Sequence, residues 1–175
     1  MKELEFIEVP SEIGAGTRGA SMGISALKVA DQNMDSSFFK DYKPKQIAVK
    51  NEFLYRDEET PSALRVEGIY AVYQNLATQL QQTIQEGKFP VILAGDHSTA
   101  GGTIAGLKMA NPDRKLGVIW VDAHADLHSP YTSPTGNVHG MPLSVCLAED
   151  NDACRKNDPD ENTVSQWERM KNLGS

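Results

Sequence analysis

Two apolar runs that end in acidic and imidazole side chains constrain this fold more than any other feature of the chain. The runs span Phe89–Ala94 and Leu116–Val121, and polar residues with metal-binding chemistry follow each of them directly. A short apolar run bounded by polar residues is typical of a buried strand. Parallel strands in α/β proteins present functional side chains at their carboxyl ends. The sequence therefore predicts a parallel sheet with a site at this edge.

The residues that follow the two runs have the types and spacing of metal ligands. Asp122, His124 and Asp126 occupy alternate positions, so in an extended backbone their side chains share one side. A lone acid or histidine after a strand is more often a helix cap or a hydrogen-bonded polar group. Four such residues, with His97 as the fourth, are costly to bury unless they are paired or bind a cation. A carboxylate and imidazole set without thiolates suits Mn, Zn, Fe, Co or Ni, and manganese is favoured.

Length, charge and cysteine content indicate one acidic intracellular domain. The 175 residues fit a single domain, 1–175, with a substantial core. A net charge of −7 without a basic cluster gives no reason to expect nucleic acid or a membrane surface as partner. No apolar run approaches membrane-spanning length, and the acidic N-terminus is unlike a signal peptide. Two isolated cysteines, Cys146 and Cys154, are typical of reduced thiols in a cytoplasmic protein.

The rest of the chain alternates expected strands and helices. Further strands are expected at Leu4–Val9 and Gln46–Val49, and helices at Ile24–Ala30, Pro61–Glu86, Ser98–Ala110 and Val164–Leu173. Ser98 or Thr99 is the expected N-cap of the third helix, and Glu149–Asn162 is an expected polar loop. The order strand, helix, strand around residues 89–121 implies a right-handed parallel crossover. The predicted fold class is α/β, with three α/β/α layers around a mostly parallel sheet.

A glycine-rich loop, Pro10–Gly23, allows a second interpretation. Gly14, Gly16 and Gly19 match the pattern G-x-G-x-x-G. A dinucleotide site needs the first glycine directly after its strand and an acidic residue at the end of the next strand, and this sequence meets neither requirement. We favour a flexible loop at the rim of a pocket. Nucleotide binding is the weaker alternative, and it would appear as NAD or ATP binding that is lost in Gly16→Val.

The motifs together resemble the arginase branch of the ureohydrolases. The resemblance rests on Gly95–Ser98 (GDHS), Asp122–Asp126 (DAHAD) and Thr135–Pro142 (TGNVHGMP), with support from Ser129–Pro134 and Gly16–Ala30. It implies an arginase-like three-layer fold, two Mn²⁺ ions, and hydrolysis of L-arginine to L-ornithine and urea. Trimers are common in this family, which implies a homo-oligomer as one arrangement of the chain.

The resemblance also implies a role for each metal-ligating residue. His97 would bind the first manganese ion and His124 the second. Asp122 would bridge the two ions, and Asp126 would bind the first ion and accept a hydrogen bond from the bridging water. Paired cations lower the pKa of a shared water, so that hydroxide can attack the guanidinium carbon near neutral pH.

The resemblance further implies a proton shuttle and a set of residues that recognise the substrate. His139 stands where the family keeps its proton shuttle, and the alternative is a loop histidine bonded to backbone. His128, Ser133, Thr135 and Asn137 occupy the positions that recognise the amino acid end of a small guanidino substrate. A histidine replaces the usual asparagine at position 128, and a threonine replaces the usual serine at position 135. The loop around His139 favours arginine over the substrates of agmatinases and formimidoylglutamases, which remain alternatives.

One family motif has no counterpart in this sequence. The family completes its metal site with an Asp-x-Asp motif at a later strand, whereas the aspartates after His139 lie in the polar loop Glu149–Asn162. We interpret the chain as an N-terminal portion of an arginase-like enzyme, truncated on its C-terminal side and with little or no activity alone. An incomplete sheet would leave an unpaired edge that promotes self-association. The second hypothesis is a non-catalytic fragment that binds a metal or a partner.

Overall fold

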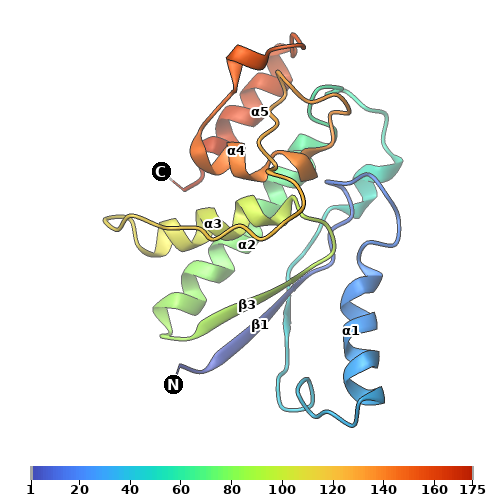
Figure 1. Cartoon of the computed structure of the whole chain (residues 1–175), viewed down its shortest axis with the longest axis vertical. Coiled ribbons are helices and arrows are strands. Elements are labelled where there is room, and N and C mark those ends of the chain that lie inside the picture. The colour runs from blue at the N-terminus through green and yellow to red at the C-terminus, as the bar shows by residue number, and fades with distance from the viewer. Residues whose placement is uncertain (1, 175) are drawn as a thin grey trace.

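The computed structural model describes residues 2–174, which are built around a small parallel sheet (Figure 1). Within these residues the strands are β1 (Leu4–Val9), β2 (Lys45–Gln46) and β3 (Phe89–Ala94), in the order β2-β1-β3 with both pairings parallel. The helices are α1 (Met22–Asn33), α2 (Val66–Gln85), α3 (Thr99–Ala110), α4 (Pro142–Leu147) and α5 (Glu161–Lys171). Short 3-10 turns form at η1 (Asn51–Tyr55), η2 (Val138–Gly140) and η3 (Asp152–Cys154). The predicted α/β class is confirmed.

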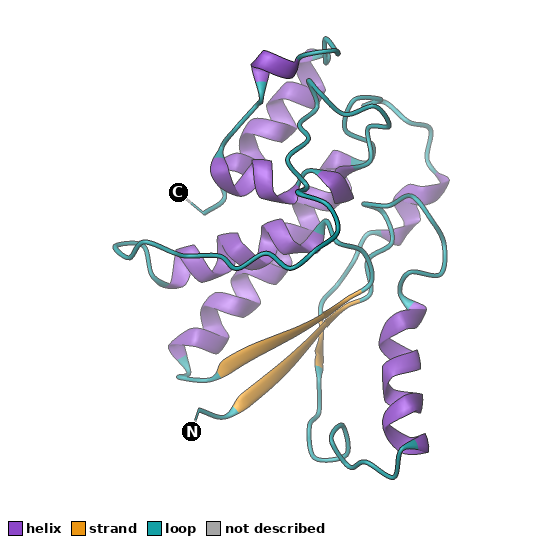
Figure 2. Ribbon diagram, viewed as in Figure 1, coloured by secondary structure: helices purple, strands orange, loops and turns teal. Residues whose placement is uncertain are grey.

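The two faces of β1 contact different helices, as the alternation of side chains along a strand requires. Ile7 and Val9 are fully buried in the core that α2 covers. On the opposite face, Glu8 forms an ion pair with Lys28 of α1. Phe6 lies on this second face and packs edge-on against the ring of Phe38, with the centroids 5.3 Å apart. The sheet therefore separates two helical layers (Figure 2).

The long helix α2 supplies more of the buried core than any other helix or strand within residues 2–174. Its buried apolar residues recur at helical spacing, and burying each large one contributes about 1.5–3 kcal/mol relative to leaving it exposed. Helix α3 lies directly beside it because glycines let the two backbones approach. A Cβ atom added at Gly102 would lie 2.9 Å from Tyr73 Cα, and one at Gly106 would lie 2.8 Å from Ala77 Cα. None of the helices within residues 2–174 has the length and apolarity needed to cross a membrane.

The second apolar run, Leu116–Val121, forms no strand, so this prediction is wrong. The run is a loop beside α3 (Figure 2). Ile119 is 94% exposed and Val121 is 92% exposed. A strand needs a neighbour for its backbone N–H and C=O groups, and the sheet β2-β1-β3 contains no strand that pairs with this run. The predicted crossover out of β3 is wrong for the same reason.

The other predicted elements form, with shifted ends. Strands Leu4–Val9 and Phe89–Ala94 have the expected bounds, and β2 is shorter than expected. Helix α2 begins at Val66 rather than at residue 61, because Arg65 adopts a left-handed backbone conformation with φ of +57°. Helix α5 begins at Glu161 rather than at residue 164, because the Asp160 side chain caps its first turn.

Candidate metal centre

Three of the four predicted ligands meet just beyond the carboxyl end of β3. Nδ1 of His97 lies 3.2 Å from Oδ2 of Asp122 and 2.8 Å from Oδ2 of Asp126. One possible ligand atom from each residue lies within 4.8 Å of the other two. Two carboxylates and an imidazole at this spacing can surround one divalent cation of the manganese or zinc type.

Asp126 provides the strongest indication that this group fits a cation. Its side chain is only 8% exposed, and Oδ2 has no hydrogen-bond partner within residues 2–174, although it lies close to the ring of His97. His97 Nδ1, 2.8 Å away, can itself ligate a metal, so a cation bound by both groups would satisfy this buried oxygen. The residue also has a φ of +49°, which is uncommon outside glycine. The Asp126 carbonyl accepts a hydrogen bond of 3.2 Å from the Leu143 amide, which helps to hold this turn.

His124 lies outside the three-residue group. Its side chain is 83% exposed, and its Nδ1 is 3.6 Å from Oδ1 of Asp122. The other oxygen of Asp122 faces His97, so this carboxylate lies between the two histidines. The His124 backbone N–H donates to Oδ1 at 2.8 Å and lowers the pKa of Asp122, and the charge of His97 lowers it further. Because Asp126 leaves the extended conformation, residues 122–126 do not form the regular alternating row that the sequence predicts.

A buried aspartate, Asp96, holds the end of β3 against the glycine-rich loop. Its Oδ1 accepts a hydrogen bond of 2.9 Å from the Ser98 amide, and its Oδ2 accepts one of 3.2 Å from the Gly14 amide. Ser98 is the N-cap residue of α3, as the sequence predicts, but its hydroxyl makes no capping hydrogen bond, and the hydroxyl of Thr99 donates to the Asp96 carbonyl. A Cβ atom at Gly14 would lie 2.2 Å from Asp96 Oδ1. Gly14 thus permits close packing of two loops, a role other than cradling a phosphate.

The glycine-rich loop is anchored by a residue that the sequence analysis did not single out. Glu12 is 3% exposed, and its Oε1 accepts hydrogen bonds from the Gly19 amide at 2.8 Å and the Ser21 hydroxyl at 2.7 Å. Its Oε2 pairs with Arg18 at 2.8 Å. Burial acts to raise the pKa of Glu12, but these contacts outweigh burial and lower it. The acidic residue inside a glycine-rich stretch was the available signal for this anchor.

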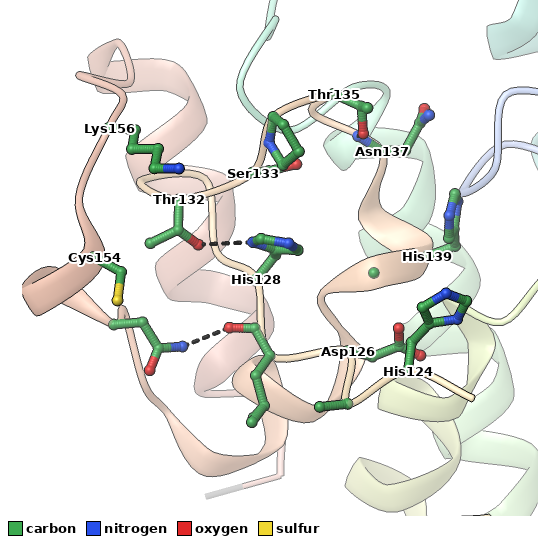
Figure 3. Close-up of a pocket in the computed structure, with 15 residues that line it drawn as sticks. His124, Asp126, His128, Thr132, Ser133, Thr135, Asn137, His139, Cys154 and Lys156 are labelled. Carbon is green, nitrogen blue, oxygen red and sulfur yellow. Dashed lines mark hydrogen bonds between the residues drawn. The ribbon is translucent and has the colours of Figure 1, made fainter. Parts of the chain in front are cut away.

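A cavity of about 790 Å³ lies next to the metal group, which is within the usual range for small-molecule sites. Asp126 and His124 line one end of it (Figure 3). The four predicted recognition residues, His128, Ser133, Thr135 and Asn137, line it as well, and so does the predicted proton shuttle, His139. Lys156 also lines the cavity, although no motif in the sequence marks it. The structure therefore brings the predicted substrate residues and two predicted ligands, His124 and Asp126, to a common space.

His139 is oriented by the glycine-rich loop. Its Nδ1 lies 3.2 Å from the Gly14 carbonyl oxygen, and its backbone amide donates to the same oxygen. Because a carbonyl only accepts hydrogen bonds, this contact requires the proton on Nδ1 and leaves Nε2 as the acceptor. The backbone contact expected for a structural histidine is thus present. It also leaves one ring nitrogen, Nε2, able to accept a hydrogen bond.

Sequence comparison gives the family of this chain. The sequence profile described as "Arginase family" matches residues 2–159. The arginase of Bacillus subtilis (strain 168) is 38% identical over 148 residues, which cover 83% of this chain and 48% of that protein. The arginase of Bacillus caldovelox is 39% identical over 151 residues, which cover 84% of this chain and 49% of that protein. The chain belongs to the arginase family. It spans about half the length of these relatives.

Solved structures of arginases have the same fold. The Bacillus caldovelox arginase at pH 5.6 superposes with a TM-score of 0.70 at 32% identity, over 88% of this chain and 52% of that one. The Bacillus cereus arginase superposes with a TM-score of 0.69 at 34% identity, over 88% of this chain and 50% of that one. The formimidoylglutamase of Bacillus subtilis is 17% identical with a TM-score of 0.60, which shows a likeness of fold alone.

The late aspartates of this arginase-family chain have structural partners. Asp150 accepts hydrogen bonds from Trp167 Nε1 at 2.7 Å and Lys171 Nζ at 2.9 Å, and so ties the polar loop to α5. Asp160 accepts from the Thr163 amide at 2.8 Å. Ion pairs with Arg155 are formed by Asp152 and Asp158. None of these four belongs to the metal group found within residues 2–174. They therefore do not replace the Asp-x-Asp motif that the resemblance implies.

Proposed function

We propose that this site belongs to a metal-dependent arginase that hydrolyses the guanidino group of L-arginine to L-ornithine and urea. The observation that carries the proposal is the convergence of His97, Asp122 and Asp126 beside a cavity lined by hydroxyl, amide and imidazole groups. Because the chain spans about half the length of its relatives, this activity is proposed for a complete family protein. We expect residues 1–175 alone to have little or no activity.

Manganese is the proposed cofactor, and two ions are expected in the complete site. His97, Asp122 and Asp126 would hold the first ion, and His124 would contribute to the second beside Asp122. Such ions, when bound, lower the pKa of a coordinated water so that hydroxide is present near neutral pH. Asp126 has a buried oxygen able to accept a hydrogen bond and orient that nucleophile. The carboxylates also oppose the positive charge of a guanidinium substrate.

His139 is the proposed proton carrier. Its Nδ1 faces the Gly14 carbonyl oxygen, so Nε2 is the nitrogen that can take up or release a proton. Imidazole titrates near neutral pH, which suits transfer of a proton between the cavity and solvent. A proton must reach the leaving amine when the carbon–nitrogen bond breaks, and His139 lines the cavity in which this occurs.

The far side of the cavity supports recognition of an amino acid over a simple amine. The Ser133 hydroxyl accepts a bond from the Gly136 amide and the Thr135 hydroxyl accepts one from the Asn137 amide, so each can still donate its own hydrogen. Hydroxyl donors suit an α-carboxylate, and Lys156 adds a positive charge. His128 Nδ1 lies 3.2 Å from the Thr132 hydroxyl, which orients its ring. This chemistry favours arginine over agmatine.

One observation favours a second candidate, a metal-binding chain without catalysis. His124 is 83% exposed and lies outside the three-residue group, so the ligands that come together suit one cation better than two.

A cytoplasmic location is also proposed, because the free cysteines Cys146 and Cys154 fit a reducing compartment. Assembly as a homo-oligomer stays a prediction.

Urea release separates the two candidates. The 175-residue chain is incubated with Mn²⁺ and either L-arginine, agmatine or N-formimidoyl-L-glutamate, alongside His97→Ala and His124→Ala. Urea from L-arginine that disappears in both variants supports the arginase proposal, even at a low rate. Release from agmatine alone would redirect the proposal to an agmatinase, and loss of formimino groups alone to a formimidoylglutamase. Mn²⁺ binding with no detectable product from any substrate would leave the non-catalytic candidate as the function of residues 1–175, and the arginase proposal would then apply to a complete family protein alone.

A further inference from the structure

Arg65 joins three segments that lie far apart in the sequence. Its Nε donates to the Ile13 carbonyl at 2.8 Å, and its Nη2 donates to Oδ1 of Asn137 at 3.2 Å. Its Nη1 lies 3.7 Å from a carboxylate oxygen of Glu58. The side chain is only 14% exposed. These contacts link the start of α2 to the glycine-rich loop and to the loop that carries the predicted carboxylate-binding residues.

The surrounding backbone is shaped to admit this side chain. Arg65 has a φ of +57°, a left-handed conformation that residues other than glycine rarely adopt. Gly16 has a φ of +67°, and a Cβ atom there would lie 2.6 Å from Arg65 Nη2. Gly136 has a φ of +72°, and a Cβ atom there would lie 2.1 Å from the Pro61 carbonyl oxygen. Two glycines thus allow the segment before α2 to pack closely against both loops.

The contact with Arg65 decides which way the Asn137 amide faces. A guanidinium group can only donate hydrogen bonds, so the atom of Asn137 that it contacts must be the oxygen. The amide nitrogen, which can only donate, then lies on the opposite side of the group. Asn137 lines the cavity, and a donor at that position suits a ligand carboxylate. With the amide reversed, its oxygen would repel the same carboxylate.

We propose that Arg65 is a positioning residue for carboxylate recognition. It holds the side-chain amide of Asn137 in the donating orientation and fixes the Thr135–His139 loop against the glycine-rich loop. The carboxylate ligand in this inference rests on the proposed function, whereas the fixed orientation of Asn137 does not. The ion pair with Glu58, at 3.7 Å between Nη1 and Oε2, is too long for a hydrogen bond, so the shorter contacts with Ile13 and Asn137 account better for an arginine at this position.

Two substitutions of Arg65 test the proposal without relying on one variant to fold. Arg65→Lys keeps the charge but cannot donate to Ile13 and Asn137 from a rigid fork. Arg65→Gly removes the side chain and suits the left-handed backbone. Arg169→Lys is the matched control, because Arg169 lies over the Tyr70 ring on the surface, away from the cavity. The side-chain amide signal of Asn137 is followed by ¹H–¹⁵N NMR and assigned by its loss in Asn137→Asp.

We expect both Arg65 variants to shift this amide signal and to speed its exchange with solvent, while Arg169→Lys leaves it unchanged. Calorimetric titration with Mn²⁺ present then compares L-ornithine with 1,4-diaminobutane, the same molecule without its carboxylate. The dissociation constant for L-ornithine should rise about tenfold, as expected for a lost hydrogen bond to a charged group. The dissociation constant for 1,4-diaminobutane should not change.

An unchanged Asn137 signal in both variants would overturn the proposal, whatever the dissociation constants of the two ligands. Equal weakening of both ligands would also overturn it, because a general loss of structure would not distinguish the carboxylate. If the unsubstituted chain binds neither ligand, the proposed function fails for this chain, and the NMR signal alone decides the role of Arg65. The two failures are therefore distinguishable.

Discussion

Oδ2 of Asp126 lies 2.8 Å from Nδ1 of His97, and this contact joins the end of a strand to a loop that has no strand of its own. His97 follows β3 directly, whereas Asp126 follows the exposed run Leu116–Val121. The position of Asp126 therefore depends on the loop after it, where the His128 amide donates to the Gly140 carbonyl at 3.1 Å. Packing of loops, more than pairing of strands, assembles the metal group in this chain.

Metal affinity should depend on His97 and Asp126 more than on His124. We expect His97→Ala and Asp126→Asn to weaken Mn²⁺ binding by at least the roughly 10–100-fold that follows loss of a supporting residue at a metal site. His124→Ala should have a smaller effect, because His124 lies outside the three-residue group. Titration of free Mn²⁺ by electron paramagnetic resonance measures this, with His128→Ala as the control that lines the same cavity. Loss of all binding in His124→Ala alone would show that the ion lies nearer to that histidine.

The cap of α5 should make stability depend on pH. The Thr163 amide and hydroxyl both donate to Asp160 and lower its pKa below the ordinary value of 3.8. A lowered pKa in the folded state means that the stabilisation is complete above the ordinary value and is lost as pH falls through the lowered one. Asp160→Ala should cost about 1 kcal/mol at pH 7, measured by urea unfolding. Asp160→Asn should keep the cap and lose this acid dependence, and an equal acid response in both proteins would contradict the assignment.

Two apolar runs with the same local pattern fold differently, which shows where prediction of this fold from sequence stops. Phe89–Ala94 forms β3 because Leu4–Val9 is present as its parallel neighbour along its full length. Leu116–Val121 is equally apolar, but no strand within residues 2–174 pairs with it, and it stays a loop. Periodicity reports which residues favour a strand, whereas the strand itself depends on a partner elsewhere in the molecule. The α/β class and most elements were therefore predictable, and this strand was not.

The short sequence spacing of the acidic and histidine residues predicted the metal group, but it did not predict the residues that hold the site in place. His97, Asp122 and Asp126 come together as their positions after the apolar runs suggest. The left-handed backbone of Asp126 could not be predicted from the sequence, because neither adjacent residue is a glycine or proline that would indicate a turn. The role of Arg65 also has no local signature, because its partners lie in segments far away in the sequence. Contacts of this kind follow from the fold and not from a motif.

The exposed apolar run should cause self-association. Ile119 and Val121 are 94% and 92% exposed, and contiguous exposed apolar surface favours contacts between copies. We expect concentration-dependent association of the unsubstituted chain in sedimentation velocity, reduced in Ile119→Ser/Val121→Ser. Leu27 and Val29 on α1 are 52% and 54% exposed at the same spacing, so Leu27→Ser/Val29→Ser is the matched control. Equal reduction by both pairs, or a monomer at every concentration, would show that the run is not responsible.

Removing the hydroxyl of Tyr73 should leave the chain as stable or more stable. The ring is fully buried between α2 and α3, and its Oη has no hydrogen-bond partner within residues 2–174. Burial accordingly raises the pKa of Tyr73 well above its usual value. An unsatisfied buried hydroxyl costs about 1–3 kcal/mol, so Tyr73→Phe should raise the urea midpoint or leave it unchanged. A clear loss of stability would mean that a water or another group satisfies the hydroxyl.

A second substitution in contact with Tyr73 checks the same packing. A Cβ atom at Gly101 would lie 2.3 Å from Tyr73 Oη and 2.6 Å from two ring carbons. Gly101→Ala should therefore destabilise the chain by about 1–3 kcal/mol through overpacking. Removing the hydroxyl relieves only the first of these contacts, so Gly101→Ala should cost less in a Tyr73→Phe background but should not become neutral. A double-mutant cycle by urea unfolding measures the difference, and strict additivity would mean that the two side chains do not meet as this packing requires.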